Sequence, residues 1–373
     1  MSVAIPEPVL WFDRIRESDG PHRDDASGKY FVTRYESVRR GFLDERLGAP
    51  GLNLAKVPKE LHQSVIDMEE RYFSRWPVFS DSPQRSVARR ALMKHLRVVD
   101  KGTIASWVDS DEPTWNAHRP FTSQWLLHLL KRSLISLLDV EQTQFDMLLK
   151  WSDEITGYLS AHPLDRGTVD RATDALASLE EFVIKNLQTA EQGLGLHLRS
   201  LLEQQQVDQS TLVGLYGQIL TGTLEPTLSA IAVALEQLTG RRERSDEFEF
   251  DGARFTHEAL RLASPFHYAP RRALEEVEID GGLIPAGSDV VLCIVAANRD
   301  PGMFPDPGRF ELRENSSKHL SFGLGGHSCP GARLAHQLCE EVTRACLDLA
   351  RNAGSRPVTF DWDVSRSMRK ITR

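Results

Sequence analysis

The 373-residue chain has little of what marks membrane, secreted or nucleic-acid-binding proteins. Its longest uninterrupted apolar stretch covers only residues 290–297, far short of the ~20 residues that a membrane-spanning helix needs. It carries 45 basic against 53 acidic residues, a net charge of −8, which argues against coating nucleic acid or an anionic membrane. No basic segment followed by an apolar run opens the sequence, so we expect no secretory signal.

Cysteine is also scarce, with four residues that all lie in the last quarter of the chain. A chain of this length can bury a core without a disulfide framework, so we expect reduced thiols. Cys339 and Cys346 lie seven residues apart on a predicted helix and Cys293 lies in an apolar stretch, which places these three in the core. We therefore expect a soluble, cytoplasmic, monomeric protein.

Apolar residues recur at spacings of three and four over residues 125–138, 145–159 and 175–187, which predicts helices there. A longer helix is expected over about 210–238. Asp208 or Ser210 would form its N-cap, and Gly240 its stop.

The pattern changes in the last hundred residues. Alternating apolar residues and Gly and Pro turns predict short strands, including one over 290–295, before a final helix over 334–351. No repeat or flexible linker interrupts the sequence, which indicates a single domain, 1–373. The fold class is therefore mainly α with a small β-sheet region (α+β), helix-rich over about 80–272 and mixed over 273–373.

The strongest local signal is a glycine-rich stretch, SFGLGGHSCPGARLA, at residues 321–335. A dinucleotide-binding fingerprint would need a third glycine where Ser328 stands, and a phosphate-binding loop would end in Gly-Lys-Ser/Thr. A Gly-x-Ser-x-Gly nucleophile elbow fails because Pro330 takes the place of the last glycine. All three common explanations therefore fail on a specific residue.

The stretch instead holds one cysteine, Cys329, directly before a predicted helix start. Backbone N–H groups at a helix N-terminus favour the thiolate, and glycines allow a large flat ligand to approach the sulfur. These are the requirements of an axial thiolate ligand to haem iron. The alternative is a buried free cysteine in a glycine-rich turn.

This stretch resembles the haem loop of the cytochrome P450 family at its diagnostic positions, Phe322, Gly323, Gly325, His327, Cys329 and Gly331. The resemblance implies a single-domain P450-like fold that binds haem b (iron protoporphyrin IX). By the same resemblance, Cys329 is the axial iron ligand, Phe322 packs on the thiolate side of the porphyrin and His327 reaches a haem propionate. Gly323 and Gly331 belong to the cofactor-binding loop.

Further matches follow the family's order along the chain. Glu258 and Arg261 stand one helical turn apart, and in the family such a pair is a buried structural element behind the haem. Arg313 lies near the position of the family's third partner, although one residue early. A pair of solvated surface charges is the alternative.

Arginines are also placed for the haem propionates. Arg271 resembles the family's propionate-binding arginine better than Arg272 does, because it leads into the alternating strand. Arg89 matches the arginine that the family has four residues after a histidine, but Arg85 replaces that histidine. Two arginines one turn apart can still clamp a carboxylate.

On the same predicted helix, Arg90, Lys94 and Arg97 share a face away from Arg85 and Arg89. A basic stripe on an acidic protein suits an acidic partner, and the resemblance implies a ferredoxin supplied by a ferredoxin reductase with NAD(P)H-derived electrons. A solvated helix face is the open alternative.

The long helix departs from the family. Members usually carry two small residues, an acid and two threonines where this chain has TGTLEPT at residues 221–227. Aligning the acid puts Glu225 in the acid position, Pro226 in the alcohol position and Thr227 beyond it. A second alignment puts Leu224 in the acid position and Glu225 in the alcohol position. Either way the usual acid–alcohol pair is broken, and proline also removes one helical N–H.

The resemblance implies an EC 1.14-like monooxygenase that oxidises a small or medium-sized organic substrate with O2, in secondary metabolism. Glu225, Thr223 and Thr227 are the expected proton-relay residues. The loop before Asp81 is expected to line the substrate pocket, together with Leu224, Phe266, His267 and Tyr268. Two alternatives remain: a haem-thiolate enzyme that inserts no oxygen (coupling, dehydrating or peroxide-dependent), and a haem-binding sensor without turnover.

Overall fold

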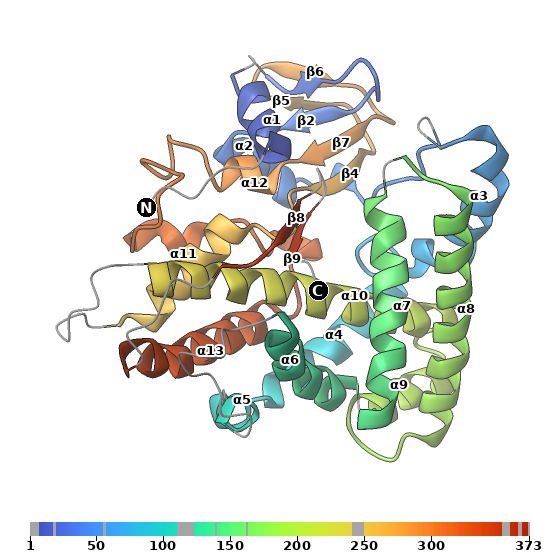
Figure 1. The fold of residues 1–373 in the computed structure, drawn as a ribbon. Helices are drawn as coiled ribbons and strands as arrows, with labels where there is room; N and C mark the ends of the chain where they lie inside the picture. Colours follow the sequence, from blue (N-terminus) through green and yellow to red (C-terminus); the bar gives the residue numbers. More distant parts are fainter. Residues whose placement is uncertain are drawn as a thin grey trace.

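The computed structural model describes residues 7–17, 20–54, 57–109, 123–138, 140–161, 163–240, 250–352, 359–364 and 368–371. Helices dominate these segments and pack around one long central helix, with a small sheet at one end (Figure 1). The predicted fold class is confirmed. The helices are α1 (Glu7–Ile15), α2 (Tyr35–Leu43), α3 (His62–Arg71), α4 (Pro83–Val98), α5 (Lys101–Asp109), α6 (Ser123–Leu138), α7 (Phe145–Ser160), α8 (Arg166–Thr189), α9 (Gly193–Glu203), α10 (Gln209–Gly240), α11 (Gly252–Ala263), α12 (Ile294–Ala297) and α13 (Ala332–Asn352).

The central helix is α10. Near one end it lies between α11 and α13, and near the other end it packs against α7 and α8 (Figure 1). Asp208 caps its start, since the Thr211 amide donates to Asp208 Oδ1 over 2.7 Å. Among the described residues α10 is also the one helix long and apolar enough to cross a membrane, but 78% of its apolar window is buried inside the protein. That burial identifies it as a core helix.

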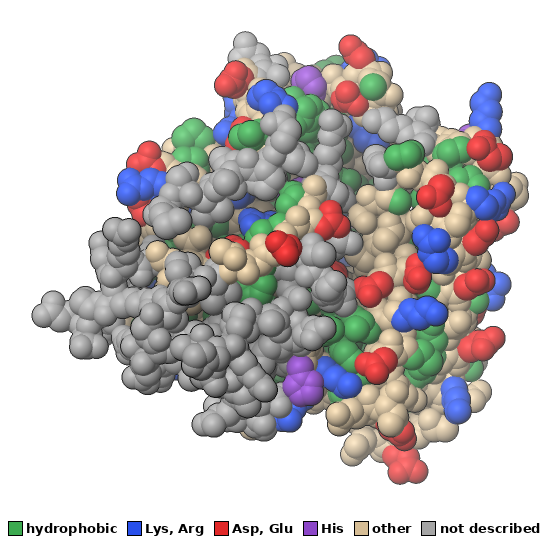
Figure 2. Space-filling view, in the orientation of Figure 1, with side chains coloured by type: hydrophobic (Ala, Val, Ile, Leu, Met, Phe, Trp, Pro, Cys, Tyr) green, Lys and Arg blue, Asp and Glu red, His purple; other side chains and the backbone are tan. Residues whose placement is uncertain are grey.

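The helices predicted from apolar spacing all form, and each buries its apolar face against a neighbour. α7 and α8 pack side by side, and acidic and basic side chains are interspersed over their outer surface (Figure 2). A single large cluster of buried side chains joins α4, α6, α7, α8, α10, α11 and α13. Cys339 and Cys346 belong to it, and Cys293 lies in a smaller cluster under α1, as predicted.

The main sheet has five strands in the order β1-β2-β7-β4-β3, and two hairpins accompany it, β5–β6 and β8–β9. β2 pairs in parallel with β7, whereas the other pairings in the sheet are antiparallel. The strands are β1 (His22–Arg23), β2 (Tyr30–Val32), β3 (Leu47–Gly48), β4 (Ala269–Ala273), β5 (Val277–Ile279), β6 (Gly282–Ile284), β7 (Asp289–Leu292), β8 (Trp362–Val364) and β9 (Arg369–Ile371).

Two sequence expectations about this region need correction. The strand predicted over 290–295 ends at Leu292, and the chain then turns into the short helix α12. The sheet also draws three of its five strands, β1, β2 and β3, from the first 50 residues, so it is not confined to the part after residue 272. These three strands are two or three residues long, too short for an alternating pattern to show.

Candidate functional site

The cysteine loop (residues 321–331) directly precedes α13 and folds back on itself. The Cys329 amide donates to the Phe322 carbonyl over 2.8 Å, which closes the turn. Gly323 and Gly325 have φ values of 59° and 68°, in the left-handed region that favours glycine. A Cβ on Gly325 would also stand 2.7 Å from the carbonyl oxygen of Phe42. The glycines therefore let the loop pack directly on α2.

The Cys329 side chain is accessible, unlike the three other cysteines, yet it is still desolvated by the protein around it. Burial raises the pKa of the Cys329 thiol, while the amides of Gly331 and Ala332 and the charge of Arg89 oppose that rise. The amides at the helix start favour the thiolate, as predicted, but burial outweighs them and the net pKa of the thiol is raised.

Two arginines of α4 reach the cysteine loop from the same helix face. Arg85 is buried and donates from Nε to the Pro77 carbonyl over 2.8 Å and from Nη2 to the Gly326 carbonyl. Arg89, one turn further, donates from Nη2 to Ser328 Oγ over 3.0 Å. Burial lowers the pKa of both guanidinium groups. α4 thus presents two desolvated cations beside the loop.

Arg271 of β4 joins them, and we name Arg85, Arg89 and Arg271 the cation cluster. Arg271 is buried over the Phe42 ring and donates to the Pro270 carbonyl over 2.7 Å. Burial and the Arg85 charge lower the pKa of Arg271 to about 10, against the opposing effect of Asp81. The next residue in sequence, Arg272, turns away to pair with Asp289.

His327 lies between the cation cluster and Asp81. Its Nε2 stands 2.7 Å from Asp81 Oδ1. The other carboxylate oxygen of Asp81 accepts a hydrogen bond from the Ala49 amide over 2.6 Å. The His327 Nδ1 atom is buried and has no hydrogen-bond partner among the described residues. Burial and the charges of Arg271 and Arg85 lower the pKa of His327 to about 4, against the opposing effect of Asp81. His327 therefore has a buried ring nitrogen without a partner beside buried cations, and its contact with a propionate stays a prediction.

These features fit an anionic, metal-bearing ligand. An exposed thiol such as that of Cys329 is suited to bind a soft or borderline metal ion, because coordination deprotonates it. The cation cluster and the orphaned His327 Nδ1 are suited to bind carboxylates, and in the described part of the chain Asp81 is the one carboxylate found to act on Arg85, Arg271 and His327. Two surface hollows, one beside α1 and one beside α6, are lined by other residues.

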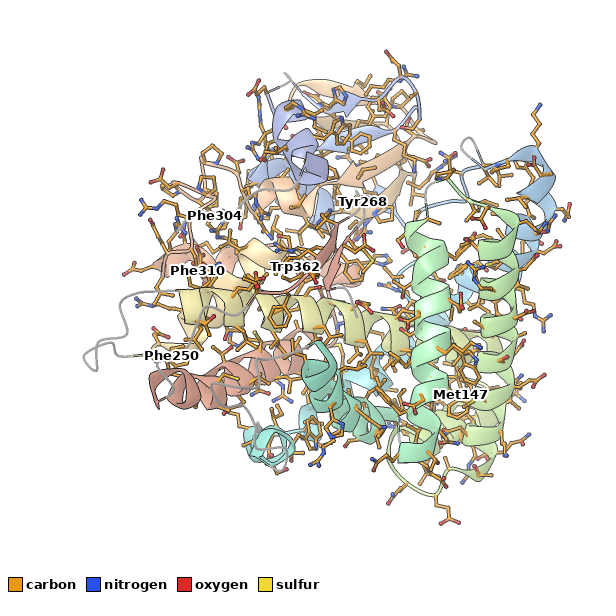
Figure 3. All side chains as sticks on the ribbon, viewed as in Figure 1. Met147, Phe250, Tyr268, Phe304, Phe310 and Trp362 are labelled. Atoms are coloured by element: carbon orange, nitrogen blue, oxygen red, sulfur yellow. The ribbon has the colours of Figure 1, made fainter. Side chains whose placement is uncertain are left out.

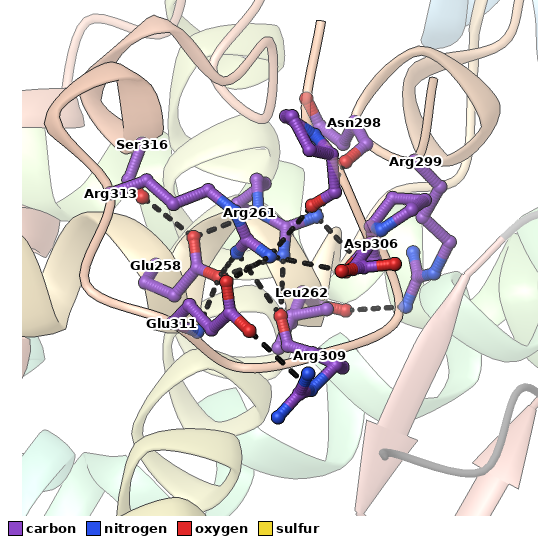
Figure 4. Close-up of polar contacts among 12 residues, drawn as sticks. Glu258, Arg261, Leu262, Asn298, Arg299, Asp306, Arg309, Glu311, Arg313 and Ser316 are labelled. Carbon is purple, nitrogen blue, oxygen red and sulfur yellow. Dashed lines mark hydrogen bonds and ion pairs between the residues drawn. The ribbon is translucent and has the colours of Figure 1, made fainter. Parts of the chain in front are cut away.

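A buried ionic network supports the loop from behind (Figure 4). The Glu258 carboxylate accepts two hydrogen bonds from Arg261, at 2.8 Å each, and one from the Glu311 amide at 3.0 Å. Arg313 and the Ser316 hydroxyl complete the set. Burial opposes ionisation, but these donors outweigh it and lower the pKa of Glu258. The three predicted residues thus do meet, with Ser316 as a partner that the sequence analysis missed.

Three histidines lie on the same side of the molecule. His257 Nδ1 stands 3.4 Å from His319 Nε2, and the rings of His257 and His336 are 4.3 Å apart. Burial, more than the neighbouring charges, lowers the pKa of His257 to about 4 and that of His319 to about 3. His319 also contacts the Phe322 ring at 5.6 Å, so the cluster supports the cysteine loop. No spacing rule links residues so far apart in sequence.

α10 is buried all round between residues 211 and 235 except along one stripe. The exceptions are Gln218, Gly222, Thr223 and Pro226, which we name the open face of α10. Gln218, Gly222 and Pro226 follow one another at spacings of four, and Thr223 lies three residues before Pro226, so the four share one side of the helix. Glu225 and Thr227 are buried and so do not belong to the open face. The predicted relay residues therefore divide, with only Thr223 on the open face.

The predicted pocket residues divide in the same way. Leu224 is fully buried in the main core, and His267 is buried beside Phe12 of α1, so neither side chain lies on an open surface. Phe266 is 41% exposed and pairs with Met368 next to β9. Tyr268 lies between the main sheet and α10, packed near α1 (Figure 3).

Three basic side chains of α4 are exposed at the protein surface, on the helix face opposite to Arg85 and Arg89: Arg90, Lys94 and Arg97. We name them the basic stripe. Asp81 is the main site residue that the sequence analysis did not assign. The available signal was its position just before the start of α4, four residues before Arg85.

Comparison with known proteins agrees with this geometry. A family profile for cytochrome P450 matches residues 254–346, which hold both the Glu258 network and the cysteine loop. A steroid C26-monooxygenase of Mycolicibacterium smegmatis is 31% identical over 236 residues, covering 60% of this chain and 58% of that protein. A steroid C26-monooxygenase of Mycobacterium tuberculosis is 29% identical over 370 residues, covering 89% and 91%.

A solved structure of P450BioI, in complex with an acyl carrier protein ligated to hexadec-9Z-enoic acid, has the same fold. It superposes with a TM-score of 0.79 at 19% identity, over 98% of this chain and 96% of that one. Family profile, relatives and fold all match cytochrome P450 proteins, in agreement with the cysteine loop and the Glu258 network.

Proposed function

We propose that this chain binds haem b at Cys329 and oxidises a small or medium-sized organic substrate with O2 and electrons from a ferredoxin and its reductase. The observation that carries the proposal is Cys329, which is exposed, unlike the other three cysteines, and lies beside the cation cluster. When bound, the haem would supply activation of O2, which the thiolate ligand favours by donating electron density to the iron.

The residues of this chain divide the remaining work. Cys329 would hold the iron, and the Phe322 carbonyl fixes the backbone that carries it. The cation cluster and His327 would hold the two haem carboxylates, since Asp81 is the one anionic group that the described residues place beside these buried donors. Gly323 and Gly331 keep the loop thin enough for a flat ligand to approach. The Glu258 network acts on the fold rather than on the substrate.

Proton delivery is proposed to run along α10. Thr223 is the hydroxyl on the open face, where it can hold a proton or orient water. Glu225 is buried one helical turn from Thr221, and Thr227 lies on the buried side as well. Glu225 and Thr227 would act through Thr223 or through ordered water rather than by direct contact.

The basic stripe is the proposed docking site for the ferredoxin. It reaches the surface on α4, and the opposite face of the same helix carries Arg89, which approaches Ser328 beside the cysteine. An acidic partner seated there would bring its electron donor to the thiolate side. Charge complementarity of this kind chiefly raises the association rate.

A steroid with an aliphatic side chain is the substrate class to test first, because the two relatives above are named steroid C26-monooxygenases. The test reconstitutes the haem-loaded protein with ferredoxin, reductase and NAD(P)H, and determines the product mass. A gain of one oxygen atom supports the proposal. Binding of haem and substrate without any product would indicate a sensor instead.

Pro226 favours a second candidate, a haem-thiolate enzyme that inserts no oxygen. The open face of α10 carries one hydroxyl and no acid, and proline cannot donate a proton. A coupling or dehydrating reaction does not need the missing donor. The same assay separates the two, because such a product would show no gain of oxygen.

A further inference from the structure

One backbone hydrogen bond is missing inside α10, and the helix continues past it. Pro226 lies inside α10, and proline has no N–H to donate to the carbonyl four residues earlier. That carbonyl belongs to Gly222. The helix nevertheless continues to Gly240, so Gly222 carries an acceptor that loses its ordinary partner.

Gly222 is also the most open position of the buried part of α10. It is exposed, whereas its neighbours Thr221 and Leu224 are buried. A Cβ built on Gly222 would meet no atom of the described residues within 4 Å, so free space lies over this turn. A ligand can therefore approach the backbone here more closely than at a residue with a side chain.

The open face looks toward the same part of the molecule as the cysteine loop. Gln218, one turn before Gly222, accepts the Val78 amide over 2.9 Å. The adjoining Pro77 carbonyl accepts from Arg85, which also donates to Gly326 in the cysteine loop. The chain segment before α4 thus bridges the open face and the loop.

We propose that the Gly222 carbonyl is a specificity-determining acceptor for a hydrogen-bond donor on the substrate, a hydroxyl or an amide N–H. The open face carries no charged side chain, and a carbonyl repels anions, so a neutral donor fits and a carboxylate does not. A bound substrate that covers this acceptor without donating to it would leave the carbonyl unpaired, which costs affinity. The inference rests on the proposed function, since it needs a substrate pocket above Cys329.

The experiment compares two probes of nearly equal shape, 1-dodecanol and 1-methoxydodecane, because only the alcohol donates. Their dissociation constants are measured from the change in the haem absorption spectrum for the wild-type protein, Pro226→Ala and Thr223→Val. Pro83→Ala, at the exposed start of α4, is the matched proline control. In Pro226→Ala the substitution restores a backbone amide that can donate to Gly222, and the hydrogen exchange of that amide, measured by mass spectrometry, reports the bond directly.

We expect the wild-type protein to prefer the alcohol by roughly three- to ten-fold, the effect of one hydrogen bond. The preference should vanish in Pro226→Ala, where the restored amide should be protected from exchange, and persist in Thr223→Val and Pro83→Ala. Equal affinities in the wild-type protein, or an alcohol preference kept in Pro226→Ala, would overturn the role of Gly222. A wild-type protein that takes up no haem would instead contradict the proposed function.

Discussion

Replacing Glu258 by Gln is expected to remove a large part of the stability of the protein. The carboxylate is fully buried and accepts five hydrogen bonds, three of them from two guanidinium groups. The amide keeps the volume but loses the charge and turns one acceptor into a donor, which faces the N–H groups of Arg261. A buried charge left without its partner typically costs about 3–5 kcal/mol. Since domains are stable by only about 5–15 kcal/mol, the variant should be marginal.

The assay is urea unfolding followed by circular dichroism, with Glu311→Gln as the matched control. Glu311 belongs to the same network but is 43% exposed and pairs with Arg309 and Arg313 at its rim. An exposed pair contributes about 0–1 kcal/mol, so the control should unfold near the wild-type midpoint. Equal midpoints for Glu258→Gln and Glu311→Gln would refute the reasoning, because burial would then make no difference.

Three further predictions follow from the site. Lowering the pH from 7 to 5 should cost about 2 kcal/mol of unfolding free energy through His319 alone. The folded pKa of His319, about 3, lies below the ordinary value, so the unfolded chain binds the proton first. His319→Asn should flatten this pH dependence, and an unchanged slope would contradict the prediction. Gly325→Ala should cost about 1–3 kcal/mol of stability and lower haem uptake in a titration, because the φ of Gly325 is positive and the Cβ would clash with the α2 backbone. Gly326→Ala should behave as wild type, because its Cβ would meet none of the described atoms within 4 Å. Equal losses in the two variants would count against the strain argument. Reversing the charges of Arg90 and Lys94 should raise the ferredoxin concentration needed for half-maximal reduction several-fold and flatten its salt dependence without changing substrate binding. Unchanged reduction kinetics would mean that the basic stripe is only solvated.

The parts of the fold that repeat a pattern along the chain could be predicted from sequence. The apolar spacing of α6, α7 and α8 reports directly which face each helix buries. The cysteine loop could also be predicted, because its glycines and its cysteine lie close together in sequence. The backbone conformation requires the glycines, and the ligand requires the cysteine. The strands β2 and β3 could not, since so few residues carry no alternation and their pairing depends on β7 and β4, which lie far along the chain.

The electrostatics of the site needed the structure for a different reason. Helix-start geometry lowers the pKa of a thiol, but burial raises it, and only the fold shows that burial is larger at Cys329. The same applies to Asp81, which is an ordinary carboxylate in sequence and the partner of His327 in space. Which face of α10 is open was likewise set by the neighbouring elements, which bury Leu224 and leave Gly222 exposed.

The central claim is that Cys329 is the iron ligand, and the absorption spectrum of the reduced, carbon monoxide-bound protein tests it most directly. Wild type, Cys339→Ala and Cys346→Ala should all show the spectrum of a thiolate-ligated haem, because those two cysteines are buried in the core of α13. Cys329→Ala should lose that spectrum while it keeps its fold by circular dichroism. A thiolate-type spectrum that survives in Cys329→Ala would contradict the account.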